Sequence, residues 1–132
     1  MIKGMGHLGI VVGDIDKSVA AFAKALNVPV PPVKDVTEKK TKVALLEFGG
    51  VGLEFIQDYS EDGAFAKLVK ERGDSIHHFC ILSDDMQADI EAMQEKGIEM
   101  ADQKPRIGLR GKPIAFTKAA SLNGIPVELS TP

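Results

Sequence analysis

Hydrophobic side chains recur every three or four residues between Ile15 and Leu26, and this spacing predicts an amphipathic helix. Its apolar face consists of Ile15, Val19, Phe22 and Leu26. Asp14 precedes the first turn, where its side chain can accept hydrogen bonds from free backbone N–H groups. Asn27 follows the last turn and suits the left-handed conformation that often ends a helix. The apolar, β-branched run at 7–12 predicts a strand before this helix.

The remaining hydrophobic segments predict further strands and a second amphipathic helix. Gly49 and Gly50 separate two apolar runs, 42–48 and 51–57, which predicts a hairpin. The prolines between 28 and 36 limit that segment to extended chain or an edge strand, because proline cannot donate a hydrogen bond to a neighbouring strand. In the second half we expect a helix at about 85–96 and paired strands at 113–118 and 124–129.

The two halves of the chain resemble each other. His7–Ile15 aligns with His78–Met86, and Gly50–Phe55 aligns with Gly124–Leu129 at a nearly equal offset. Two matches in the same order indicate a duplicated β-α-β-β-β module. We therefore expect an α+β fold of two tandem βαβββ modules in a single domain, 1–132. The modules are expected at about 5–57 and 76–130, with a connecting helix at about 61–73.

Composition and charge narrow the function classes. Of the 132 residues 44% are hydrophobic and 27% charged, so the chain can bury a core and disorder is not expected. A net charge of −3 argues against nucleic-acid binding, which needs a dense cationic surface. The single Cys80 excludes an intrachain disulfide and fits a reducing compartment. Because a signal-peptide core and a membrane-spanning run are both absent, we expect a cytoplasmic protein with no membrane partner.

Each half supplies one histidine on its first predicted strand and one glutamate on its last. These residues are His7, Glu54, His78 and Glu128. A carboxylate inside an apolar strand is costly to bury unless it is paired, and one metal ion would pair both glutamates. Two imidazoles and two carboxylates suit a borderline divalent ion: Zn, Ni, Co, Mn or Fe. His77 precedes His78, so we expect its side chain on the opposite face of the strand and not among the ligands.

These residues resemble the vicinal oxygen chelate superfamily, which includes glyoxalase I, extradiol dioxygenases and bleomycin-resistance proteins. The opening strand His7–Val12 is shared widely in that superfamily, whereas Phe65–Phe79 and Pro105–Phe116 are similar to the methylmalonyl-CoA epimerases. Ile125–Leu129 fits both epimerases and glyoxalases. The resemblance covers nearly the whole chain and implies the glyoxalase-type fold, a cupped, barrel-like mixed sheet around a divalent ion.

The resemblance to the epimerases also implies an activity. Such an enzyme inverts the configuration of the α-carbon of a CoA thioester such as methylmalonyl-CoA, by proton transfer through a metal-stabilised enolate. The implied metal ligands are His7, Glu54, His78 and Glu128. Glu38, within Val36–Ala44, would be one base and Glu128 the other, because inversion needs acid–base groups on both faces of the carbon. The implied partners are a small acyl-CoA substrate and a second copy in a homodimer. The candidate cations for the CoA phosphates are Arg106, Arg110, Lys112 and Lys118.

The sequence departs from the epimerase pattern at two places, after Glu38 and after Phe116, where Thr117–Ala120 follow. Other activities of the superfamily therefore stay open. A glyoxalase I-type lactoylglutathione lyase would use the same ligands on a glutathione adduct. A non-catalytic small-molecule-binding or resistance protein commonly lacks the four ligands. An iron dioxygenase typically uses two histidines and one carboxylate.

Overall fold

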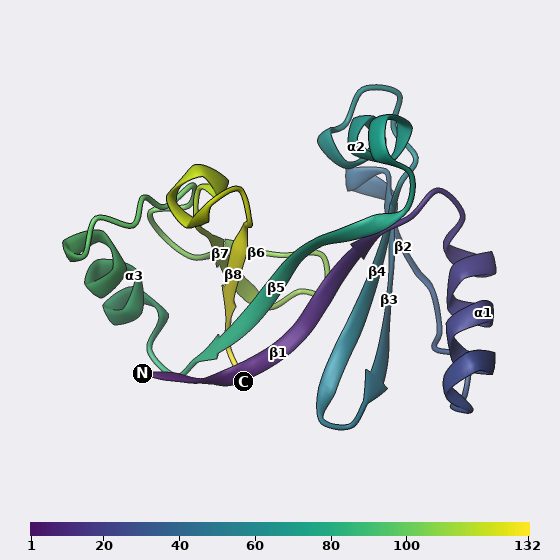
Figure 1. Cartoon of the computed structure of the whole chain (residues 1–132), viewed down its shortest axis with the longest axis horizontal. Coiled ribbons are helices and arrows are strands. Elements are labelled where there is room, and N and C mark those ends of the chain that lie inside the picture. The colour runs from purple at the N-terminus through teal and green to yellow at the C-terminus, as the bar shows by residue number, and fades with distance from the viewer. The chain divides into compact units, whose positions relative to one another are not determined.

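A computed structural model describes residues 1–132, which form eight strands, three α-helices and two short 3-10 helices (Figure 1). The first half contains β1 (Ile2–Val11), α1 (Ile15–Leu26), β2 (Lys34–Val36), β3 (Thr41–Phe48) and β4 (Val51–Asp58). After α2 (Ala64–Arg72), the second half contains β5 (Ser75–Ser83), α3 (Met86–Glu95), β6 (Arg106–Ile107), β7 (Pro113–Phe116) and β8 (Val127–Ser130). The predicted β-α-β-β-β order is thus present twice, and the α+β class is confirmed.

The chain forms two compact units. One unit combines Met1–His7 with His77–Pro132, and the other spans Leu8–Ile76. Both unit boundaries fall inside strands, β1 and β5. As a result, the first residues of the chain belong to the same unit as its second half. The single domain with modules at about 5–57 and 76–130 stays a prediction.

The unit Leu8–Ile76 has the strand order β2-β3-β4-β1 with α1 alongside β3 and β4 (Figure 1). The predicted α1 is confirmed, because Asp14 accepts a hydrogen bond from the amide of Lys17 and Asn27 ends the helix with a φ of 56°. Gly49 and Gly50 both have positive φ, which the tight β3–β4 turn requires. The core of this unit contains Ile10, Val12, Ile15, Val19, Ala23, Ala44, Leu46 and Phe55.

The unit of Met1–His7 and His77–Pro132 has the strand order β1-β5-β8-β7-β6. β5 and β8 are parallel, whereas β7 is antiparallel to both of its neighbours, so the sheet is mixed as predicted. Asp85 caps α3 by accepting a hydrogen bond from the amide of Ala88. The core beneath α3 contains Met86, Ile90, Met100, Ala115 and Leu129.

Several element boundaries differ from prediction. β7 ends at Phe116 and β8 begins only at Val127, because the chain between them forms a 3-10 helix, Ala119–Leu122. That helix ends at Asn123, which has a φ of 58°, and Gly124 follows with a φ of 91°. Positive φ values of this size are incompatible with a strand. The proline segment forms a strand only at β2, and β1 begins earlier than predicted.

The helices are short. α2 begins at Ala64 instead of about 61, because the preceding residues turn around Asp58. The carboxylate of Asp58 accepts hydrogen bonds from the amides of Ser60, at 3.0 Å, and Ala66, at 3.2 Å. α1 is the longest helix, with 12 residues. None of the three is long and apolar enough to cross a membrane.

Candidate metal and catalytic site

Three of the predicted ligands lie on neighbouring strands of one unit. Cys80 on β5 lies opposite Glu128 on β8. His78 precedes Cys80 by two residues, so its side chain leaves the same face of the sheet as that of Glu128. His7 lies on β1, which is the other neighbour of β5. Strand alternation and register therefore direct all three side chains toward one place.

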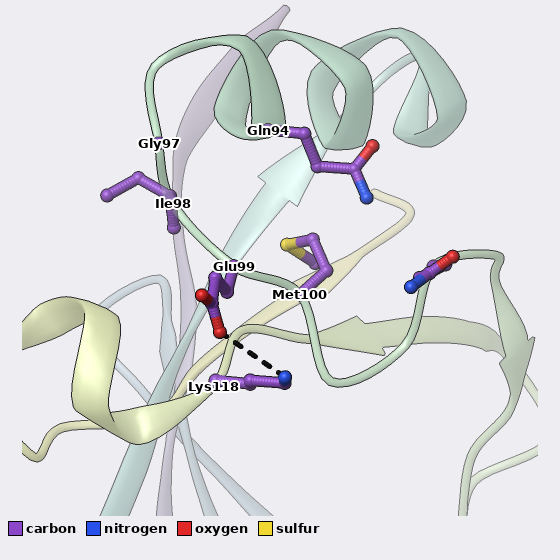
Figure 2. A pocket seen from close by; sticks show the side chains of 7 residues that line it. Gln94, Gly97, Ile98, Glu99, Met100 and Lys118 are labelled. Carbon is purple, nitrogen blue, oxygen red and sulfur yellow. Dashed lines mark ion pairs between the residues drawn. The ribbon is translucent and has the colours of Figure 1, made fainter.

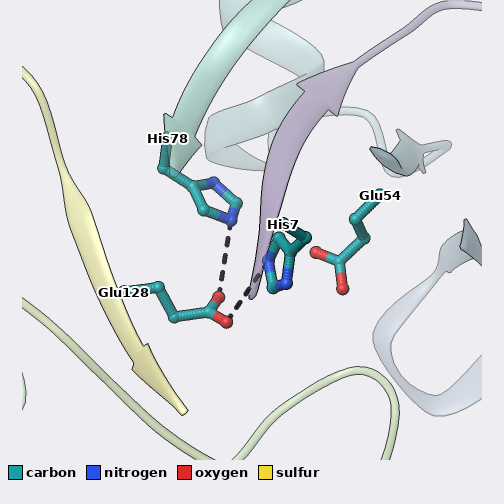
Figure 3. A group of neighbouring side chains, drawn as sticks. All are labelled: His7, Glu54, His78 and Glu128. Atoms are coloured by element: carbon teal, nitrogen blue, oxygen red, sulfur yellow. Dashed lines mark ion pairs between the residues drawn. The ribbon is translucent and has the colours of Figure 1, made fainter. Parts of the chain in front are cut away.

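The carboxylate of Glu128 lies between the two imidazoles (Figure 3). Its Oε1 is 3.4 Å from Nε2 of His7, and its Oε2 is 3.4 Å from Nε2 of His78. The two rings are nearly perpendicular, with centroids 5.5 Å apart. The exposed fractions of His7, His78 and Glu128 are 2%, 1% and 5%. The site is thus a buried carboxylate with one imidazole nitrogen beside each oxygen.

Burial and the two imidazoles shift the pKa of Glu128 in opposite directions. Burial raises this pKa, because the charged form loses its hydration. The contact with His78, the electrostatic attraction of His7 and His78, and the contact with Cys80 lower it. Together they outweigh burial, so the pKa of Glu128 lies below its ordinary value of 4.5. Glu128 is therefore ionised at neutral pH, as a metal ligand or a general base must be.

The three side chains form a donor set that can hold a divalent metal ion. The ligand atoms of His7, His78 and Glu128 lie within 4.8 Å of one another. Metal–ligand distances are about 2.0–2.2 Å for imidazole nitrogen and carboxylate oxygen, so one ion can reach all three atoms with small side-chain adjustments. Mixed nitrogen and oxygen ligands suit several first-row ions, so the donor set does not select one metal.

The second ring nitrogen of His7 faces a cation. Nη2 of Arg110 lies 3.3 Å from Nδ1 of His7. A guanidinium only donates hydrogen bonds, so Nδ1 accepts and the proton of the neutral ring is on Nε2. A metal ion needs the lone pair at Nε2, which this tautomer does not offer. Metal binding at Nε2 therefore requires the proton of His7 to move to Nδ1. Arg110 must then give up its hydrogen bond with Nδ1.

A tight loop between β6 and β7 brings Arg110 to His7. The amide of Gly108 donates to the carbonyl of Lys112, and the amide of Gly111 donates to the carbonyl of Gly108. Gly111 has a φ of 79°, which favours glycine. Sequence reasoning placed Arg110 among the candidate phosphate cations and missed its contact with His7. No local signal reveals a contact between residues 103 positions apart.

The second ring nitrogen of His78 faces another histidine. The Nδ1 atoms of His77 and His78 are 2.8 Å apart, and the rings are nearly perpendicular. The ring of Phe116 packs edge-on against His78, with centroids 5.0 Å apart. Strand alternation predicted that His77 points away from His78. The two rings nevertheless meet, because Nδ1 lies near the backbone end of each side chain.

The other two predicted site residues belong to the unit Leu8–Ile76. Glu54 lies on β4 opposite Leu45 of β3, and its exposed fraction is 5%. It is drawn with the three clustered residues in Figure 3. Glu38 lies in the 3-10 helix Thr37–Lys39 and is exposed. The role of Glu54 as a fourth ligand and that of Glu38 as a base stay predictions.

Arg106 and Lys118, which are candidate phosphate cations, each pair with a carboxylate. Nε of Arg106 lies 2.9 Å from Oδ1 of Asp102. Nζ of Lys118 lies 3.3 Å from Oε2 of Glu99, beside a hollow next to the end of α3 (Figure 2). The hollow is lined by Gln94, Gly97, Ile98, Glu99, Met100, Gln103 and Lys118 and shares no residue with the metal-ligand cluster. These pairs reduce the positive charge that Arg106 and Lys118 offer to a phosphate.

Comparisons with known proteins agree with one another. Residues 6–116 match the Glyoxalase/Bleomycin resistance protein/Dioxygenase superfamily. An uncharacterised protein of Bacillus subtilis is 29% identical over 97% of this chain and 91% of its own length. An ethylmalonyl-CoA/methylmalonyl-CoA epimerase of Cereibacter sphaeroides is 28% identical over 98% of both chains.

A solved structure shares the fold. It is a variant of Streptomyces coelicolor methylmalonyl-CoA epimerase in complex with 2-nitronate-propionyl-CoA. The TM-score is 0.89, with 25% sequence identity and coverage of 99% of this chain and 95% of the other. This likeness confirms the glyoxalase-type fold predicted from the sequence.

Proposed function

Since the chain belongs to the glyoxalase/bleomycin resistance/dioxygenase superfamily, we propose that it is a metal-dependent epimerase of a CoA thioester such as methylmalonyl-CoA. The observation that carries this proposal is the buried carboxylate of Glu128 between two imidazoles. Relatives of nearly the same length that are named as epimerases of such thioesters support the substrate class.

In this proposal, His7, Glu54, His78 and Glu128 hold one divalent ion, whose identity is Co, Ni, Zn, Mn or Fe. When bound, the ion supplies positive charge that stabilises the oxyanion of an enolate. His7 and His78 contribute neutral nitrogen ligands. Glu54 contributes a carboxylate that is otherwise costly to bury.

Glu128 and Glu38 divide the proton transfer. Glu128 is ionised and buried, so one of its oxygens can take the α-proton as the C–H bond breaks. The electron pair of that bond passes into the thioester as an enolate. Protonated Glu38 then donates a proton to the opposite face of the α-carbon, and this inverts the configuration of that carbon. In the reverse reaction the two carboxyl groups exchange roles.

We propose that the protein works as a homodimer in the cytoplasm on a small-molecule substrate. Size-exclusion chromatography with light scattering measures the mass in solution and tests the dimer, while cell fractionation tests the location.

Metal analysis and substrate assays on the purified wild-type protein test the function. We expect one divalent ion per chain and exchange of the α-proton of methylmalonyl-CoA in heavy water, with interconversion of the two epimers. A parallel assay offers the hemithioacetal of glutathione and methylglyoxal. Lactoylglutathione formation without exchange of methylmalonyl-CoA would replace the epimerase with the lyase. Absence of both reactions in metal-loaded protein would leave a binding protein on the same fold.

A further inference from the structure

His77 makes a contact that the proposed reaction does not use. Its Nδ1 lies 2.8 Å from Nδ1 of His78, while Nε2 of His78 faces Oε2 of Glu128 at 3.4 Å. The two nitrogens of the His78 ring therefore face different groups. Nε2 faces Glu128, and Nδ1 faces His77. The proton of a neutral His78 ring occupies only one of these two nitrogens.

Ligation through Nε2 fixes the position of that proton. The lone pair of Nε2 must be available to the ion, so Nδ1 of His78 carries the proton and donates. Nδ1 of His77 is the atom within reach, and it accepts if His77 carries its own proton on Nε2. Histidine ligands generally donate their second N–H to such a partner, which orients the ring and raises its basicity.

We propose that His77 is a positioning residue for the metal site, which accepts a hydrogen bond from Nδ1 of His78 and so keeps Nε2 available to a divalent ion. The inference rests on the proposed function only in taking His78 as a ligand. A histidine suits this place better than the usual carboxylate or carbonyl partner. Its Nδ1 can also donate, so His78 keeps the hydrogen bond when Nε2 carries a proton in the metal-free protein.

The surroundings hold His77 in place for this role. It is half-buried, and its ring lies 6.4 Å from the ring of Phe116, tilted by 60°. Phe116 lies directly opposite Glu128 on β8, and it also packs against His78. The two ligand histidines thus differ in their support, because a donor-only group faces Nδ1 of His7 whereas a group that can accept faces Nδ1 of His78.

Two substitutions separate the hydrogen bond from packing. His77→Phe keeps a ring against Phe116 but removes the acceptor, whereas His77→Asn keeps a polar atom near the position of Nδ1. We expect His77→Phe to weaken Zn²⁺ binding by about 10- to 100-fold in competition with a chelator, with one ion still bound at saturation. His77→Asn is expected to recover most of that affinity. The metal-free variants are expected to unfold at similar temperatures.

Long-range 1H–15N NMR on the zinc-loaded protein reports the tautomer directly. In the wild type we expect a protonated Nδ1 and a metal-bound Nε2 in His78, and a His77 ring that binds no metal. Wild-type affinity in His77→Phe, or a zinc-bound nitrogen in His77, would overturn the inference. Neither measurement uses a CoA substrate, so an inactive protein that still shows these effects would reject the epimerase and keep the role of His77. A wild-type chain that binds no divalent ion rejects both.

Discussion

Arg110 donates a hydrogen bond to Nδ1 of His7, at 3.3 Å, and thereby places the proton of His7 on the nitrogen that faces Glu128. The contact leaves the N–H of His7 on Nε2, which lies 3.4 Å from Oε1 of Glu128 with no hydrogen bond between them. It opposes metal binding at the same nitrogen. We therefore expect metal loading and the position of the β6–β7 loop to be coupled through one proton.

Replacing Arg110 should tighten metal binding. In Arg110→Met, Nδ1 of His7 can take the proton without loss of a hydrogen bond, so we expect the dissociation constant for Zn²⁺ to fall by about tenfold, which corresponds to about 1.4 kcal/mol. Competition with a chelator measures it. Lys112→Met is the matched control, because Lys112 is an exposed cation of the same loop. Equal effects of both substitutions would assign the change to net charge rather than to the tautomer.

Glu128→Gln should abolish proton exchange. The amide keeps the shape of the side chain but cannot accept the α-proton, so we expect exchange of methylmalonyl-CoA in heavy water to slow by about 10²–10⁴-fold. The assay is run at saturating metal, because the substitution also removes an anionic ligand. Near-ultraviolet circular dichroism checks the fold. A metal-replete variant that exchanges at the wild-type rate would remove Glu128 as a base.

Glu38→Gln should separate exchange from epimerisation. If Glu38 and Glu128 act on opposite faces, the variant still removes the proton of one epimer through Glu128 but cannot invert the carbon. We expect deuterium incorporation into that epimer with little interconversion. Glu47→Gln is the control, because Glu47 is another exposed carboxylate of the same unit. Normal interconversion in Glu38→Gln would show that another group protonates the second face.

Asp58→Asn should destabilise the start of α2 in a pH-dependent way. Burial raises the pKa of Asp58, but hydrogen bonds from Ser60, Ala66 and Phe65 outweigh burial, so the folded pKa lies below 3.8. A lowered pKa means that the ionised form stabilises the fold above pH 3.8, and that this contribution disappears as the pH falls through the folded pKa.

We expect a difference of about 1 kcal/mol between wild type and Asp58→Asn in the free energy of unfolding near pH 7. Urea denaturation at several pH values measures this difference, which should shrink below pH 3.8. Asp62→Asn changes the same charge in an exposed neighbour and serves as the control. A difference that stays constant with pH would contradict the role of the Asp58 charge.

Gly108→Ala should destabilise the loop that carries Arg110. A Cβ atom at Gly108 would lie 2.8 Å from Cδ1 and 3.0 Å from Cγ2 of Ile114, so either the loop or Ile114 must move. Overpacking of this kind costs about 1–3 kcal/mol. Gly13→Ala is the control, because its new Cβ meets nothing closer than 3.6 Å. Thermal unfolding compares the two, and equal melting temperatures would show that the loop adjusts freely.

Local signals in the sequence predicted much of the fold. α1 has the predicted limits, because Asp14 and Asn27 are strong capping residues and the apolar face is regular. β8 begins later than predicted, because Asn123 and Gly124 form a left-handed turn and pairing with β5 starts only at Val127. Neighbouring residues therefore determine the limits of helices and tight turns. The ends of strands depend on pairing with residues that are distant in the sequence.

The candidate site was predictable only in part. The duplicated pattern predicted His7, Glu54, His78 and Glu128 as ligands, and the structure brings the ligand atoms of His7, His78 and Glu128 together. The groups that face Nδ1 of His7 and Nδ1 of His78 were not predictable from that pattern. Arg110 reaches His7 through the packing of a loop, and His77 reaches His78 through side-chain torsion angles, neither of which affects hydrophobic periodicity.

The assignment of Met1–His7 to the unit formed by His77–Pro132 has a consequence during synthesis. His7 is translated before the strand that carries Glu128, which is made more than a hundred residues later. The segment Met1–His7 therefore lacks its final neighbours while the intervening chain is translated. Its unpaired edge is then open to association with other nascent chains. The proposed metal site of His7, His78 and Glu128 is complete only after β8 emerges.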